Sequence, residues 1–375
     1  MSISTTQYLE VAERMRQIYE DAEMRMTDAI AGRAARGYDA TGWQAEKLAE
    51  VQDVRKELEK AVSDLRHSRG EISAAVQKAY EDAGLRCKTD IAAFTDVLGI
   101  SHINVNTQKV AAILQELNGS VSAMDRVILR QAQDAYSEVI GNASALMATG
   151  TVTRQQAVSQ ALDDFAKRGI TGFVDKSGRR WDMTNYAEMA TLTAIERATR
   201  YGYMDTMQAY GYDLAIISSH AGACELCVAW EDVVISVSGN NHDYPSLSDA
   251  EGGGCFHPRC LHDISVYYGD LDRRNGKDHP EPVKEPSAAY SARVSQRALE
   301  RGIRQAKREM RVAQAVGDPQ AERKAYAKVR KGQERIRALR NDYNSSTPYS
   351  KDWLPRQYSR EGGRVVLSPK AKKTR

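Results

Sequence analysis

The sequence predicts a mainly α-helical protein with a small α+β domain, and three observations lead to that fold class. Residues 1–150 repeat apolar side chains at the spacing of amphipathic helices. Residues 151–285 contain short apolar runs between loops rich in Gly, Asn and Ser, a pattern of strands and turns. Residues 286–342 return to helical spacing with many basic side chains. We therefore expect an N-terminal helical bundle, a central Cys/His knuckle domain and a C-terminal basic helical hairpin.

The N-terminal region, residues 1–150, is expected to be a bundle of amphipathic helices. One apolar stripe runs through residues 5–32, and a second runs from Leu48 to Leu65. Helices joined by short connections bury such stripes against one another. The same spacing also suits a coiled coil with other copies of the chain, so both forms of packing stay open. Three further helices are expected at residues 71–83, 108–117 and 122–147.

The central region, residues 151–285, is expected to combine helices with short strands. Thr153 is a suitable N-cap for a helix that Gly169 ends. Beyond this helix the apolar runs become too short for helices and are separated by turn residues. The remaining elements expected here are a hairpin at 172–181, a helix at 184–210, strands at 214–217 and 233–237, and a loop at 238–254.

The C-terminal region begins after linker prolines at positions 280, 282 and 286. Two helices, at 288–316 and 320–341, are expected to form a hairpin through Gly317, Asp318 and Pro319. Gly suits a helix end, Asp caps the next helix, and Pro is tolerated at the first helical position because that N–H has no partner there. Residues 343–375 are expected to be a basic, partly flexible tail.

The net charge of +3 conceals an uneven distribution along the chain. Residues 281–375 hold 24 Lys and Arg against 10 Asp and Glu, so the body is acidic and the C-terminal part is basic. Such a segment is typical of contact with nucleic acid or an acidic partner, and it also suits solvated outer faces of helices. The candidate nucleic-acid contacts lie on consecutive turns of the first hairpin helix: Arg301, Arg304, Lys307, Arg308 and Arg311.

Four of the five cysteines crowd into 37 residues, which points to metal binding before disulfides. Cys224 with Cys227, and His257 with Cys260, are two pairs with two residues between their ligands, so each pair can converge on one tetrahedral ion. These four are the first-choice ligands, and thiolates favour Zn²⁺ over Mg²⁺ or Ca²⁺. Four protein ligands would make the zinc structural. The alternative ligands are Cys255, His262 and His220, and reduced cysteines without metal are the other interpretation.

Several classes of protein are not expected. No apolar run is long enough for a membrane span, and the first residues lack the pattern of a secretory signal. Gly252, Gly253 and Gly254 are not followed by the Lys and Ser/Thr of a phosphate-binding loop, and Ser218 and Ser219 do not form a nucleophile elbow. We therefore expect no catalytic residues, no enzyme activity and no small-molecule substrate.

Two segments around the cysteines resemble the minor capsid protein 2 family of tailed bacteriophages, within the wider class of Mu-type head morphogenesis proteins. In this chain Glu231 and Asp232 stand where family members commonly have Gln-Gly, and Leu261 stands where they often have Arg. Metal binding is inferred from local spacing and not from the resemblance. The segments that carry or support the resemblance are Ile217–Ser236, Gly254–His262, Tyr186–Arg200, Gly211–Ile217, Tyr290–Lys307 and Tyr358–Glu361.

The resemblance implies a structural minor capsid protein of the virion. Its expected partners are the phage portal protein and other head proteins, and packaged DNA is a further expected partner. Its expected place is the capsid interior or portal vertex, and the host cytoplasm during assembly. The implied role is head morphogenesis, with DNA packaging or delivery as a further possibility. Two alternatives stay open: a zinc-stabilised nucleic-acid-binding or processing protein of the cytoplasm, and a scaffold whose basic helices meet an acidic protein surface.

Overall fold

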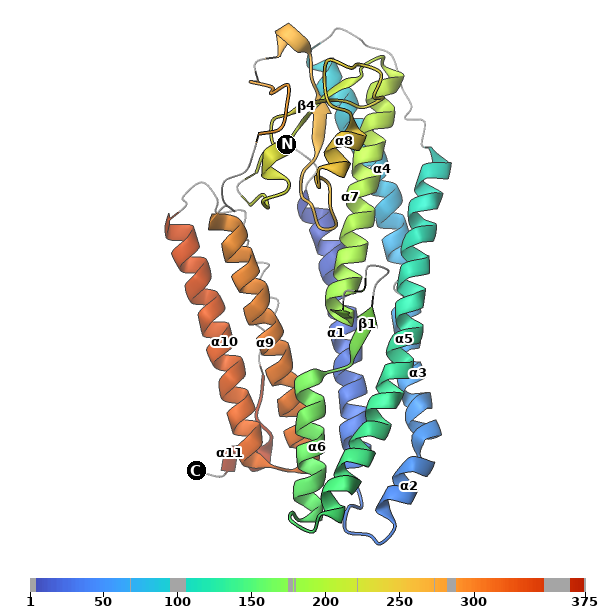
Figure 1. The fold of residues 1–375 in the computed structure, drawn as a ribbon, viewed down its shortest axis with the longest axis vertical. Coiled ribbons are helices and arrows are strands. Elements are labelled where there is room, and N and C mark those ends of the chain that lie inside the picture. Colours follow the sequence, from blue (N-terminus) through green and yellow to red (C-terminus); the bar gives the residue numbers. More distant parts are fainter. Residues whose placement is uncertain are drawn as a thin grey trace. The chain divides into compact units, whose positions relative to one another are not determined.

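The computed structural model describes residues 5–67, 69–94, 106–174, 178, 180–220, 222–272, 274–281, 288–346 and 365–373 (Figure 1). The protein is mostly helical and contains a small antiparallel three-stranded sheet, which confirms the predicted fold class. None of the described helices is long and apolar enough to cross a membrane. The helices are α1 (Thr5–Ala34), α2 (Trp43–Ala49), α3 (Val51–His67), α4 (Arg69–Ala92), α5 (Thr107–Ala148), α6 (Arg154–Arg168), α7 (Met183–Ala209), α8 (Leu247–Gly252), α9 (Ala288–Val316), α10 (Pro319–Ser346) and α11 (Pro369–Lys373). The strands and 3-10 turns are β1 (Thr171–Val174), β2 (Arg180–Asp182), β3 (Leu214–Ile217), β4 (Val234–Ser236), β5 (Ile264–Val266), η1 (Val228–Trp230) and η2 (Gly269–Leu271).

The chain folds into two compact units, and each unit is assembled from three separate segments. We call them the sheet unit and the hairpin unit. The division of the sequence into four consecutive regions stays a prediction, and each compact unit combines pieces of more than one region. The sheet unit comprises Met1–Arg16, Ser68–Val121 and Ala187–Ser291, and the hairpin unit comprises Gln17–His67, Ser122–Tyr186 and Ala292–Arg375.

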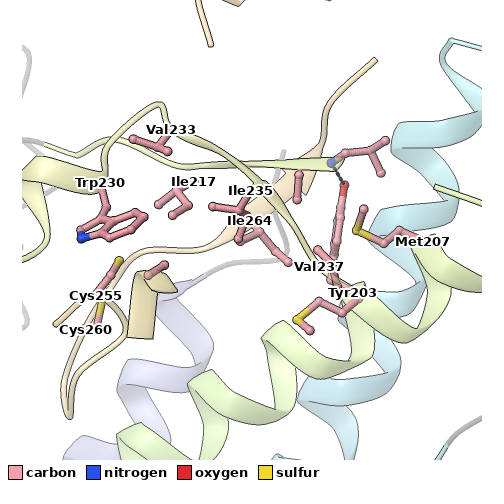
Figure 2. Close-up of a cluster of buried hydrophobic side chains, with 14 of the residues drawn as sticks. Tyr203, Met207, Ile217, Trp230, Val233, Ile235, Val237, Cys255, Cys260 and Ile264 are labelled. Atoms are coloured by element: carbon pink, nitrogen blue, oxygen red, sulfur yellow. Dashed lines mark hydrogen bonds between the residues drawn. The ribbon is translucent and has the colours of Figure 1, made fainter. Parts of the chain in front are cut away.

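The sheet unit is built around three short antiparallel strands. Strand β3 lies in the middle, where Ala215 pairs with Ile235 of β4 on one side and with Val266 of β5 on the other. The sequence did not predict β5, because its three residues have no longer apolar run around them, whereas the equally short β4 lies within the apolar run 233–237. Buried side chains of the sheet pack with those of α7, including Tyr203 and Met207, to form the core drawn in Figure 2.

Helices α4 and α7 of the sheet unit approach each other closely at Gly202. A Cβ at this position would overlap the backbone carbonyl of Tyr80 on α4. Two side-chain contacts join the same helices: Tyr80 to Asp205, and Tyr203 Oη to Asp90 Oδ2 at 2.7 Å. Because only glycine lacks a Cβ, the crossing depends on the residue at position 202.

The hairpin unit contains the predicted pair of C-terminal helices. Gly317 has φ 71°, and Asp318 Oδ1 accepts hydrogen bonds from the backbone N–H groups of Gln320 at 2.9 Å and Ala321 at 3.0 Å. The expected turn and cap are thus confirmed. At Gly332 a Cβ would lie 2.5 Å from Ile303 Cγ1, so glycine allows α9 and α10 to pack closely. Their shared apolar cluster contains Ile303, Ala306, Val329 and Ile336.

Two further predictions of helices and loops were wrong, and a predicted helix cap and a predicted hairpin are confirmed. The two helices expected at 108–117 and 122–147 form one helix, α5, because buried Leu117 and Val121 continue its apolar stripe past Gly119. The segment 238–254 was expected to be a loop, but a capping box between Ser246 and Asp249 starts the short helix α8 there. The Thr153 cap and the antiparallel hairpin of β1 and β2 are confirmed. Pro282, Pro286, residues 175–177, Tyr358–Glu361 and residues 347–364 of the expected tail lie outside the described residues.

Candidate metal centre

The cysteine and histidine pairs lie on two loops of the sheet unit. Cys224 and Cys227 occupy a turn between β3 and η1, and His257 and Cys260 occupy the loop between α8 and β5. In each pair the second residue donates its backbone N–H to the carbonyl of the first, at 3.2 Å for Cys227 to Cys224 and 2.9 Å for Cys260 to His257. The turn brings the ligand atoms of Cys224 and Cys227 within 4.8 Å of each other, whereas His257 and Cys260 fall in different groups of close ligand atoms. The two pairs are brought together although about thirty residues separate them.

Short distances connect the ligand atoms of the two loops. Cys224 Sγ is 3.0 Å from His257 Nε2, and Cys227 Sγ is 3.6 Å from Cys260 Sγ. Cys260 Sγ is also 3.3 Å from His262 Nδ1. Two overlapping groups result, Cys224 with Cys227 and His257, and Cys227 with Cys260 and His262, and the atoms of each group lie within 4.8 Å of one another. Cys227 belongs to both groups.

The distance between Cys227 and Cys260 is compatible with tetrahedral zinc, whereas the 3.0 Å between Cys224 Sγ and His257 Nε2 is shorter than a shared ion would give. Zn–S bonds of about 2.3 Å and Zn–N bonds of about 2.0 Å place two sulfur ligands about 3.8 Å apart and a sulfur and a nitrogen about 3.5 Å apart. The 3.6 Å between Cys227 and Cys260 is close to the first value, and a disulfide would need about 2.05 Å. All five cysteines are free thiols. The four first-choice ligand atoms are divided between the two groups: His257 lies with Cys224 and Cys227, and Cys260 lies with Cys227 and His262, so the choice of these four stays a prediction.

The alternative residues occupy different positions around this cluster. Cys255 is 2% exposed and belongs to the same buried core as Cys227 and Cys260. The ring of His220 lies 4.2 Å from the ring of His262, between centroids, and His220 is in neither group of close ligand atoms. His262 Nε2 lies 3.1 Å from Glu231 Oε1. Glu231 therefore orients His262, a contact that the sequence analysis did not identify.

The cluster favours a thiolate next to a charged imidazole. Hydrogen bonds from the Cys227 and Cys255 thiols lower the pKa of Cys260 well below its ordinary value. Burial alone would lower the pKa of His262, but hydrogen bonds to Cys260 and Glu231 outweigh it and raise this pKa to about 9. The same hydrogen bonds raise the pKa of Cys227, so the thiolate is shared unevenly within the cluster, and metal binding would release the proton of the other thiol.

Trp230 covers the cluster on its apolar side. Its side chain is 6% exposed, and Figure 2 shows the indole beside Cys255 and Cys260. A Cβ on Gly253 would lie 2.6 Å from Trp230 Cζ2, so glycine lets the loop pass directly over the ring. The four cysteines of the cluster are buried, whereas His257 is partly exposed.

Helix α7 holds the second ligand loop through contacts that the sequence analysis missed. Arg259 has a left-handed backbone with φ 68°, and its Nη2 lies 2.9 Å from Glu188 Oε2. The guanidinium of Arg200 lies 4.2 Å from the centroid of the Phe256 ring. Left-handed backbone costs about 1–2 kcal/mol at a non-glycine residue, so these contacts offset strain in the loop. The sequence signal that could have predicted these contacts is the presence of charged residues within the otherwise apolar helix α7.

The five basic residues predicted to contact nucleic acid lie on α9, within the hairpin unit. Arg304 and Arg308 are buried, whereas Arg301 is exposed and has no ion pair in the described part of the chain. The other four face acidic side chains: Arg304–Asp182 at 3.6 Å, Lys307–Glu20 at 2.9 Å, Arg308–Glu23 at 3.0 Å and Arg311–Asp28 at 3.3 Å. A contact between these four and phosphate would have to break ion pairs within the protein.

Comparison with known proteins agrees with the resemblance seen in the sequence. Residues 3–341 match the family described as phage minor capsid protein 2. A protein of Lactococcus phage LL-H named "Structural protein" is 27% identical over 237 residues, which cover 60% of this chain and 61% of that relative. No solved structure matches the chain. Since the family match extends over nearly all of the sequence, the chain belongs to the phage minor capsid protein 2 family.

Proposed function

We propose that the protein is a structural component of a tailed-phage head that acts at the portal vertex during head morphogenesis. The family match and the name of the Lactococcus phage relative support a structural role in a phage particle. The match spans 61% of that relative, so its full activity and its partners belong to the proposal. The proposed partners are the portal protein and other head proteins, and the proposed role requires no catalysis.

The observation that carries the proposal is the closed nature of the cysteine and histidine cluster. Cys227 is 1% exposed and Cys260 is 4% exposed, and Trp230 covers them. A catalytic zinc keeps one coordination position open for water or substrate, whereas a structural zinc is enclosed by four protein ligands. An enclosed cluster supports a rigid hub for protein–protein contacts more than it supports a reaction centre.

The proposed zinc would be held by Cys224, Cys227, His257 and Cys260. Their loops contain little regular structure, so an ion would fix the two loops to each other and to the sheet. Binding free energy at structural zinc sites contributes directly to folding. The proposal therefore includes a loss of stability in the sheet unit when zinc is removed.

The proposed function is tested by quantitative mass spectrometry of purified phage particles. We expect a few to a few dozen copies of the chain per particle, and chemical cross-links to the portal protein. Absence from both mature particles and assembling heads would contradict the proposal. If the chain is absent from particles and the purified protein binds zinc and DNA, the result would favour the alternative function, a nucleic-acid-binding protein of the cytoplasm.

A further inference from the structure

Helix α10 carries basic residues in two exposed rows. Residues three, four and seven positions apart share one side of a helix, which places these side chains in rows along the axis. The first row extends over about 16 Å at 1.5 Å per residue. The rows contain Lys324, Lys328, Lys331 and Arg335 on one side, and Arg330 and Arg337 on the other.

Packing of α10 fixes the direction of these rows. Val329 and Ile336 are buried against Ile303 of α9, and Ala325 is buried on the same side. The helix therefore cannot rotate without exposing its apolar side. All six basic residues are exposed, and Lys324 and Lys328 lie at the edge of this helix contact, where they line a hollow with Glu309 of α9.

The rows differ from the basic residues of α9 in that, within the described part of the chain, one of their six members has an acidic partner. Lys328 Nζ is 2.5 Å from Glu309 Oε2. Among the residues that the structure describes, no ion pair involves the other five basic residues of the rows. Their charges therefore face solvent, whereas four of the five basic residues predicted on α9 are balanced by carboxylates.

We infer that this face of α10 binds the phosphate backbone of double-stranded DNA, without sequence preference. The residues between the rows are Ala327, Glu334 and Ala338, and they provide no apolar or aromatic anchor. Protein–protein interfaces depend on such anchors, whereas binding to DNA draws its free energy from release of counterions by Lys and Arg. The inference rests on the proposed function, because a structural protein of the phage head would be in contact with the packaged genome.

The inference is tested with the full-length protein and a fluorescently labelled 30-base-pair duplex of arbitrary sequence. The variant combines Lys324→Gln, Lys331→Gln and Arg335→Gln. The control combines Lys60→Gln, Arg126→Gln and Arg297→Gln, which makes the same change in net charge at exposed positions of α3, α5 and α9, none of them a candidate nucleic-acid contact. Fluorescence anisotropy between 50 and 300 mM salt gives the Kd and its salt dependence for each protein.

We expect the α10 variant to bind at least about tenfold more weakly at the lower salt concentrations. Its slope of log K against log salt should fall by about 3, because each lost phosphate contact removes about 0.9. The control should bind nearly as the unchanged protein does. Equal losses in both variants, or no binding by the unchanged protein, would overturn the inference. Particle counts by mass spectrometry would still test the head-protein role separately.

Discussion

The guanidinium of Arg308 lies 3.0 Å from the carboxylate of Glu23, and both side chains are buried in the hairpin unit. Arg308 Nε also donates to the backbone carbonyl of Ala166 at 3.0 Å. A Cβ at Gly169 would lie 2.8 Å from Arg308 Cζ, so glycine makes room for the guanidinium. One side chain of α9 therefore joins α1, α6 and the turn after α6.

Loss of Arg308 should destabilise the hairpin unit strongly. Burial raises the pKa of Glu23 and Arg308 opposes that change, so Arg308→Met leaves a poorly compensated buried carboxyl group. We expect a decrease of about 3–5 kcal/mol in the free energy of unfolding, measured by urea denaturation. Arg311→Met, at a half-exposed pair, should cost less than about 1 kcal/mol. Combining Arg308→Met with Glu23→Leu should recover most of the lost stability. Equal losses of stability in Arg308→Met and Arg311→Met would contradict this interpretation.

Gly202→Ala should destabilise the sheet unit. The added Cβ would meet the backbone of Tyr80, which cannot move aside as a flexible side chain can. We expect a cost of about 2–3 kcal/mol, seen as a lower Tm by circular dichroism. Gly119→Ala is the matched control, because nothing lies within 4 Å of that position in α5. The control should be neutral or slightly stabilising, and a Gly202→Ala protein as stable as the control would refute the close crossing of α4 and α7.

Removal of two thiols should abolish metal binding. We expect the unchanged protein to contain one zinc per chain by elemental mass spectrometry, and the combination Cys224→Ser with Cys227→Ser to contain none and to have a lower Tm. Cys87→Ala is the control, because burial raises the pKa of this thiol to about 12 and it lies outside both ligand groups. It should keep its zinc. Full stability of the unchanged protein without any metal would make the cluster incidental.

The two histidines should respond differently to substitution. In the first-choice set, His257 is a ligand and His262 supports Cys260, so His257→Asn should lose zinc. His262→Asn should retain zinc with an affinity lowered by about 10- to 100-fold, as is usual for residues that support a ligand. Competition with a chromogenic chelator measures both affinities. The reverse result would assign the site to Cys227, Cys260 and His262.

Local features of the fold could be predicted where their physical cause lies within a few residues of sequence. The turn of Gly317, Asp318 and Pro319 is one case, since the cap and the left-handed glycine are set by neighbouring atoms. The proximity of Cys224 and Cys227 is another, because the spacing of two residues restricts how that loop can turn. The short strand β5 has no longer apolar run around it, and the helix α8 carries too few residues to show a pattern.

The environment of α9 could not be predicted in the same way. The spacing of Arg304 and Arg308 places them on one side of a helix, but it does not say which segment covers that side. Their neighbours include Asp182 in β2 and Glu23 in α1, far away in the sequence. A basic helix in contact with acidic residues of the same protein has the same sequence pattern as one in contact with DNA.

The interleaved segments of the two units constrain how the protein can form on the ribosome. Met1–Arg16 emerges early, but the sheet unit lacks its strands until Ala187–Ser291 has been translated. The hairpin unit must wait for α9, which follows. A break anywhere between residues 17 and 291 separates parts of both units, so nascent or truncated chains expose apolar surface that chaperones and proteases recognise. Both units can therefore be completed only late in translation. If synthesis stops before residue 291, neither unit is complete.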